Sequence, residues 1–92
     1  MSQPKMRYRW AVRRTQKEPG EPCKLVSNMN GYTSELLTAY EHTSDALETH
    51  SLDAESYGNV FDSFRKLGGI YAKSYRVDGG LVTALIYEIQ ED

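Results

Sequence analysis

The segment from Tyr57 to Gly68 constrains the fold most, because it contains a helical apolar stripe together with a signal for where the helix ends. Apolar residues recur at the i, i+3, i+4, i+7 spacing of one helix face, namely Tyr57, Val60, Phe61, Phe64 and Leu67. Arg65 and Lys66 fall in the last turn, and Gly68 follows. The pattern predicts an amphipathic helix, capped by Ser51 or Asp53, that ends at Gly68.

Two strand-like runs follow this helix, at 70–77 and 81–89, separated by Asp78-Gly79-Gly80. Asp-Gly supplies the positive φ values of a tight hairpin turn. The last run is apolar on both faces, which indicates a central strand that is covered on at least part of its second face. In the 70–77 run, one face carries Tyr71, Lys73 and Tyr75.

The N-terminal run from Met6 to Arg13 alternates cleanly. Met6, Tyr8, Trp10 and Val12 point one way, and Arg7, Arg9, Ala11 and Arg13 point the other. This period of two predicts a half-buried strand. After a turn at 18–22, the segment 23–27 is expected to return as a weaker strand that breaks at 28–31.

The segment 34–49 predicts either one helix or two pieces divided near Thr43, with Thr33 or Ser34 as the N-cap. The expected fold class is therefore α+β, an antiparallel sheet of three or four strands with two helices packed on one face, in the order β(β)ααββ. The last strand is expected between the first and the penultimate one.

Length and composition limit the kinds of protein that this chain can be. Ninety-two residues, 39% of them hydrophobic, predict a single domain spanning 1–92. No apolar run approaches the roughly 18–20 residues of a membrane span, and no signal peptide is recognisable at the start. One cysteine excludes an internal disulfide. These features predict a cytoplasmic protein without a membrane partner.

No catalytic motif is recognisable. Cys23 has no identifiable base and is expected to be a small, mostly buried thiol. His42 and His50 are eight residues apart, too far to share a metal ion on one helix, and no glycine-rich loop opens a helix. We expect no enzyme activity, no catalytic residue, no metal or other cofactor and no small-molecule substrate.

Charge is segregated along the chain. Residues 1–24 hold seven basic side chains against two acidic ones, whereas residues 25–64 hold seven acidic side chains and no Lys or Arg. Such asymmetry indicates a charged partner. The alternative is that the two parts attract each other across the fold.

The basic strand suggests a binding surface. Arg7, Arg9 and Arg13 are expected on the outer face of the sheet, with Arg14 or Lys17 extending the track. Tyr71, Lys73 and Tyr75 are expected to share that surface. Arginine binds phosphate in a bidentate manner and stacks on bases, so the face suits RNA or a single strand. The alternative is an ordinary solvated sheet face.

The acidic helices suggest a second surface. Glu41, Asp45 and Glu48 carry no compensating cation nearby in sequence and suit a basic groove on a partner protein. The alternative role of these carboxylates is solubility.

From Met6-Arg7-Tyr8-Arg9-Trp10-Ala11-Val12-Arg13-Arg14 onward, the whole chain resembles small bacteriophage anti-CRISPR proteins of the type I-F inhibitor group in size, charge layout and general look. The resemblance implies a non-catalytic inhibitor in the host cytoplasm. Such an inhibitor would bind the CRISPR RNA-guided surveillance complex, through protein subunits and guide RNA, and block target DNA recognition. Two alternatives stay open: a small RNA- or single-strand-binding regulator, and a structural or assembly protein that pairs through a sheet edge.

Overall fold

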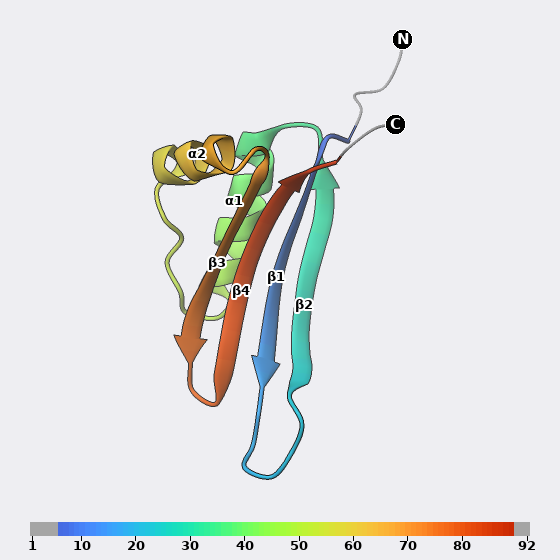
Figure 1. Cartoon of the computed structure of the whole chain (residues 1–92), viewed down its shortest axis with the longest axis vertical. Helices are drawn as coiled ribbons and strands as arrows, with labels where there is room; N and C mark the ends of the chain where they lie inside the picture. The colour runs from blue at the N-terminus through green and yellow to red at the C-terminus, as the bar shows by residue number, and fades with distance from the viewer. Residues whose placement is uncertain (1–5, 90–92) are drawn as a thin grey trace.

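The computed structural model describes residues 6–89 and has the α+β architecture expected from the sequence. Its elements follow the order β1 (Tyr8–Gln16), β2 (Lys24–Thr33), α1 (Leu36–Glu48), α2 (Tyr57–Lys66), β3 (Ile70–Val77) and β4 (Gly80–Glu88). The four strands form one antiparallel sheet in the order β2-β1-β4-β3 (Figure 1). The last strand thus lies between the first and the penultimate strand, which confirms the expected topology.

Both helices pack on one face of the sheet, α1 mainly against β1 and α2 against β3 (Figure 1). The core lies between these two layers. Its largest fully buried side chains are Val12, Leu47, Val60, Val82 and Ile86. The alternation in the first strand follows from this arrangement, because only one face of β1 is covered by the helices.

The second strand is longer than the sequence indicates. The expected break at 28–31 is wrong, since β2 continues to Thr33 and pairs with β1 along its whole length. Gly31 lies directly opposite Trp10, and a Cβ at Gly31 would come within 2.9 Å of the Trp10 Nε1 atom. The indole fills the space that a side chain at this position would need, so the glycine permits close packing rather than ending the strand.

The first helix is one continuous element. Thr43 does not divide it, because its hydroxyl donates to the Ala39 carbonyl at 2.8 Å and the residue lies in the buried stripe. The expected caps are wrong: Glu35 is the N-cap, without a side-chain capping bond. The Thr33 hydroxyl instead donates to the Glu35 carbonyl at 2.8 Å, which positions the turn into the helix.

The second helix starts later than expected. Its N-cap is Ser56, whose hydroxyl accepts the Asn59 N–H at 3.2 Å, and not Ser51 or Asp53. Residues 49–56 form a linker beside β3 in which Leu52 packs against the core. The predicted end is confirmed, because Gly68 takes a φ of 73° directly after the C-cap.

The far face of β4 is not covered by any element of residues 6–89, contrary to the expectation for this doubly apolar strand. Leu81 is 43% exposed and Leu85 is half-buried on that side. Within the same described range, neither helix is long and apolar enough to cross a membrane.

We expect Phe64→Ala to lower the free energy of unfolding by about 3–5 kcal/mol, the usual cost of removing a buried aromatic ring. Phe64 is 7% exposed and its ring meets that of Tyr8 edge-on at 5.9 Å. Phe61, although on the same predicted stripe, is 37% exposed, so Phe61→Ala is the matched control and costs clearly less. Urea denaturation of both variants measures the difference. Equal losses would contradict this packing.

Candidate nucleic-acid interface on the open sheet face

The sheet face that the helices do not cover is formed by sixteen side chains in four rows across the strands. We call it the open face. Directly opposite residues in antiparallel strands share a face, so the register gives its rows. In the order β2, β1, β4, β3 the rows are Tyr32–Arg9–Tyr87–Ile70, Asn30–Ala11–Leu85–Ala72, Asn28–Arg13–Thr83–Ser74 and Leu25–Thr15–Leu81–Arg76.

Charge on the open face has one sign. Its sixteen positions include Arg9, Arg13 and Arg76 but no Asp or Glu. The other positions are apolar, aromatic or neutral polar, so the face combines cations with flat apolar surface. This combination suits a polyanion that also offers rings for stacking.

Arg9 is positioned by Tyr32 on the neighbouring strand. Its Nη1 donates to the Tyr32 hydroxyl at 2.7 Å, and its guanidinium carbon lies 5.1 Å from the centre of the Tyr32 ring. Tyr87 lies on the other side of Arg9 in the same row. The row therefore presents a guanidinium between two aromatic rings, and Tyr32 is 53% exposed.

Further cations continue this surface toward the hairpin ends. Arg13 is four residues from Arg9 on β1, about 13 Å away at a rise of about 3.3 Å per residue. Arg76 and Lys17 line a hollow of about 470 Å³ whose other walls include Leu81 and Val77. Among the residues that the structure describes, those lining the hollow include no Asp or Glu, so the hollow extends the positive surface over an apolar floor.

Three of the predicted arginines lie near this surface. Arg9 and Arg13 face outward as predicted, and Arg13 is exposed. Arg7 lies just before β1, with its Nη2 atom 3.9 Å from Oε1 of Glu88. Both of these side chains are substantially exposed, so the pair leaves the Arg7 guanidinium accessible.

The placement of Arg14 on the same track is wrong. Arg14 faces the helix layer, opposite Val82 and Ser27. Its Nη1 lies 3.3 Å from Nδ1 of His50, and its Nε is buried without a hydrogen-bond partner in the described chain. Alternation along β1 accounts for this, since Arg13 and Arg14 point to opposite faces.

The expected outward placement of Tyr71, Lys73 and Tyr75 is also wrong. Register with β4 puts them opposite Ile86, Ala84 and Val82, which are all fully buried on the helix side. Tyr71 is 5% exposed and belongs to the core. The sequence predicts the alternation within β3 correctly, but the face expected to be outward is the one that packs against the helices.

These three residues form a cluster with the linker between the helices. The Lys73 Nζ atom lies 2.7 Å from Oε1 of Glu55, and this bond raises the pKa of Lys73. The Tyr40 hydroxyl donates to the Glu55 carbonyl at 2.7 Å. Burial raises the pKa of both Tyr71 and Tyr75 above the ordinary value of 10.0. The Tyr75 hydroxyl is buried without a hydrogen-bond partner among residues 6–89.

Tyr75→Phe is expected to leave the free energy of unfolding at pH 7 unchanged or higher, because it removes a buried hydroxyl that lacks a partner. Because burial raises the pKa of Tyr75 in the folded chain, its hydroxyl ionises less readily there than in the unfolded chain, so stability falls as pH rises above about 10. The variant therefore loses less stability between pH 7 and pH 11 than the parent. Urea titrations at both values test this, with exposed Tyr32→Phe as the control; equal pH dependence in the two variants would contradict it.

The sequence alone does not identify Tyr32, Tyr87 and Arg76 as site residues. The expected break at 28–31 leaves Tyr32 outside the sheet. Tyr87 and Arg76 alternate with buried residues, and only the register between β3 and β4 shows which set is outward. The available signal was the pairing across Asp78-Gly79-Gly80, which places Tyr71 opposite Ile86.

The acidic residues share one side of α1. Glu41, Asp45 and Glu48 are all exposed and recur at the i, i+4, i+7 spacing of a helix stripe. The helix contains no Lys or Arg. Because the buried positions of α1 lie on the opposite side, this acidic stripe points away from the sheet.

The ion pairs of residues 6–89 do not join the basic N-terminal part to the acidic helices. They are Arg7–Glu88, Lys24–Glu21 and Lys73–Glu55. Within the part of the chain that the structure describes, no ion pair therefore joins the basic N-terminal part to the acidic helices.

Cys23, His42 and His50 have different surroundings from one another. Cys23 is exposed, not buried as expected, and lines the hollow near Lys17. His42 stacks on Trp10 with ring centres 5.5 Å apart, whereas His50 contacts Arg14. Between residues 6 and 89, no three His, Cys, Asp or Glu side chains gather as metal ligands would.

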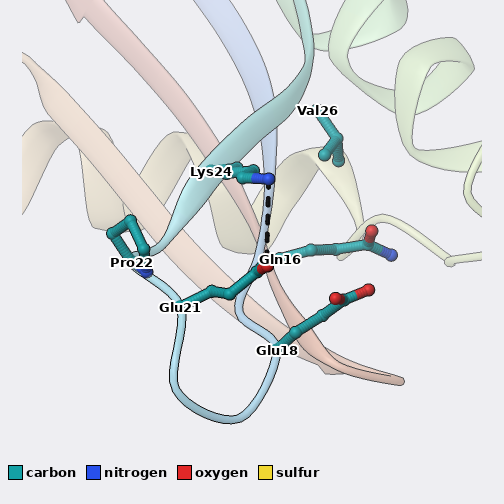
Figure 2. A pocket seen from close by; sticks show the side chains of 6 residues that line it. All are labelled: Gln16, Glu18, Glu21, Pro22, Lys24 and Val26. Carbon is teal, nitrogen blue, oxygen red and sulfur yellow. Dashed lines mark ion pairs between the residues drawn. The ribbon is translucent and has the colours of Figure 1, made fainter.

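A small hollow of about 80 Å³ lies in the loop between β1 and β2 (Figure 2). Glu18, Glu21 and Lys24 line it, and the Lys24 Nζ atom lies 3.6 Å from Oε2 of Glu21. This space has room for only a few water molecules at about 30 Å³ each. It is a turn stabilised by an exposed ion pair rather than a ligand site.

No family model, curated protein or solved structure matches this chain significantly.

Proposed function

We propose that this chain is a non-catalytic protein that binds single-stranded nucleic acid, RNA above all, through its open face. The observation that carries the proposal is the sixteen-residue face with Arg9, Arg13, Arg76 and two tyrosines and without a carboxylate. The guanidinium groups pair with phosphates, and the exposed Tyr32 ring offers a platform on which a base stacks.

Within this proposal, the resemblance to type I-F anti-CRISPR proteins gives a specific setting. The ligand is then guide RNA, with adjoining protein, in a surveillance complex, and the chain acts in the host cytoplasm to block target DNA recognition. The open face supports this setting because a flat sheet reaches RNA that is already displayed along a protein surface.

A second candidate function comes from the acidic stripe of α1. Glu41, Asp45 and Glu48 are exposed together on a helix without cations. Such a surface complements a Lys- and Arg-rich groove that normally holds DNA. In this mode the helix layer makes the contact and the open face remains accessible.

Arg9→Glu with Arg13→Glu is expected to weaken binding of a labelled single-stranded RNA at least about tenfold, because two phosphate contacts become repulsive. The slope of log affinity against log salt falls by roughly 1.4, from about 0.7 per lost contact. Fluorescence anisotropy across a salt series measures both quantities. Arg65→Glu with Lys66→Glu, two exposed cations at the end of α2, is the matched control and retains affinity.

The same variants test the setting in a surveillance complex. With purified type I-F complex and its target DNA, the double arginine variant is expected to lose inhibition. A variant with Glu41→Gln, Asp45→Asn and Glu48→Gln is expected to keep it. The reverse result would replace the open-face proposal by the acidic-stripe mode. RNA binding without inhibition of the surveillance complex would favour the alternative that the chain is a small RNA-binding regulator.

A further inference from the structure

We propose that two copies of this chain pair antiparallel along the free edge of β2 and form a continuous eight-stranded sheet. An edge strand presents a row of unpaired backbone N–H and C=O groups. β2 has ten residues, pairs with β1 on one side, and has no element of residues 6–89 on the other (Figure 1). The inference is independent of whether the open face binds RNA.

Exposed apolar side chains gather on this edge. Of the ten exposed large hydrophobic residues in the described chain, four belong to β2: Leu25 (56%), Val26 (49%), Met29 (38%) and Tyr32 (53%). Leu25 and Tyr32 lie on the open face, and Met29 lies opposite Val12 on the helix side. A strand laid against this edge therefore shields apolar surface on both faces of the sheet.

The other edge of the sheet is built differently. The linker between the helices runs beside β3, where Glu55 bonds Lys73 at 2.7 Å and Leu52 packs against the core (Figure 1). β3 also carries the charges of Lys73 and Arg76, and charges discourage pairing at an edge. The free edge available for pairing is thus that of β2.

Charge selects a second copy as the occupant. Lys24, at the start of β2, is the strand's only charged residue, and exposed Glu35 follows its end by two positions. In an antiparallel pair with its twofold axis near Met29, Lys24 of each copy lies beside Glu35 of the other. Within residues 6–89, the ion-pair partner of Lys24 is Glu21 at 3.6 Å, and both side chains are exposed, so replacing this pair by one with Glu35 of the second copy costs little (Figure 2).

The geometry of this pairing preserves the open face. A twofold axis perpendicular to the sheet leaves both open faces on the same side, so their arginines form one continuous surface. Stacking two open faces against each other would instead oppose six arginines without a carboxylate. Repulsion disfavours that arrangement, whereas edge pairing avoids it.

Sedimentation velocity across a concentration series up to about 1 mM tests for the dimer, since edge pairing alone buries less surface than a tight interface. Amide hydrogen exchange identifies the interface. Above the dissociation constant, alternate amides between Ser27 and Tyr32 are expected to exchange more slowly, while those of β3 keep their rates.

Met29→Lys is expected to raise the dimer dissociation constant at least about tenfold, because two like charges then face each other near the axis. Met29 is on the helix side, so affinity of each monomer for RNA stays unchanged. Leu37→Lys, an apolar residue on α1 that is 45% exposed, is the matched control and leaves the constant within about twofold.

Three results would overturn the proposal. They are a monomer throughout the concentration series, a dimer whose β2 amides exchange as in the monomer, and equal effects of Met29→Lys and Leu37→Lys. Loss of RNA binding in the arginine variants leaves each of these readouts unaffected, so the two proposals fail separately.

Discussion

The structure depends on β1, because one face of this strand packs in the core and the other faces solvent. Strand β1 lies between β2 and β4 and contributes Trp10 and Val12 to the core. Two short helices can cover only one face of a four-stranded sheet, so the intervening positions of β1 have to be compatible with water. Arg9 and Arg13 satisfy that requirement. The same alternation that builds the core therefore also places guanidinium groups on an open surface.

The sequence was sufficient for the features that local periodicity determines. Alternation in β1, the apolar stripe of α2 and the glycine after it each follow from a strong local pattern. The strand order also followed, because β4 is apolar on both faces and has to be central. Outward Arg9 and Arg13 could be predicted for the same reason, since Trp10 and Val12 leave only one orientation for β1.

The features that depend on contacts between distant residues could not be predicted in this way. Gly31 is compatible with a strand only because the Trp10 indole packs against it from β1. On β3, each face mixes apolar and charged side chains, Ile70 with Arg76 on one and Tyr71 with Lys73 on the other, so composition does not show which face is buried. Tyr71 faces the helix layer because it lies opposite Ile86. This orientation depends on the register between β3 and β4 and not on the local sequence pattern. The sequence therefore predicts Tyr71 and Tyr75 as the aromatic residues of the site, whereas the open face carries Tyr32 and Tyr87.

The open face and the outer side of α1 carry charges of opposite sign, so the molecule is electrostatically polar between these two surfaces. The open face carries arginines without carboxylates, and the outer side of α1 carries Glu41, Asp45 and Glu48 without cations. A net charge of −2 hides this polarity. In the field of the proposed polyanionic ligand, the open face is attracted and the acidic stripe of α1 is repelled, which favours approach with the open face forward. If the open face binds nucleic acid as proposed, the acidic stripe of α1 disfavours approach with that side toward the ligand.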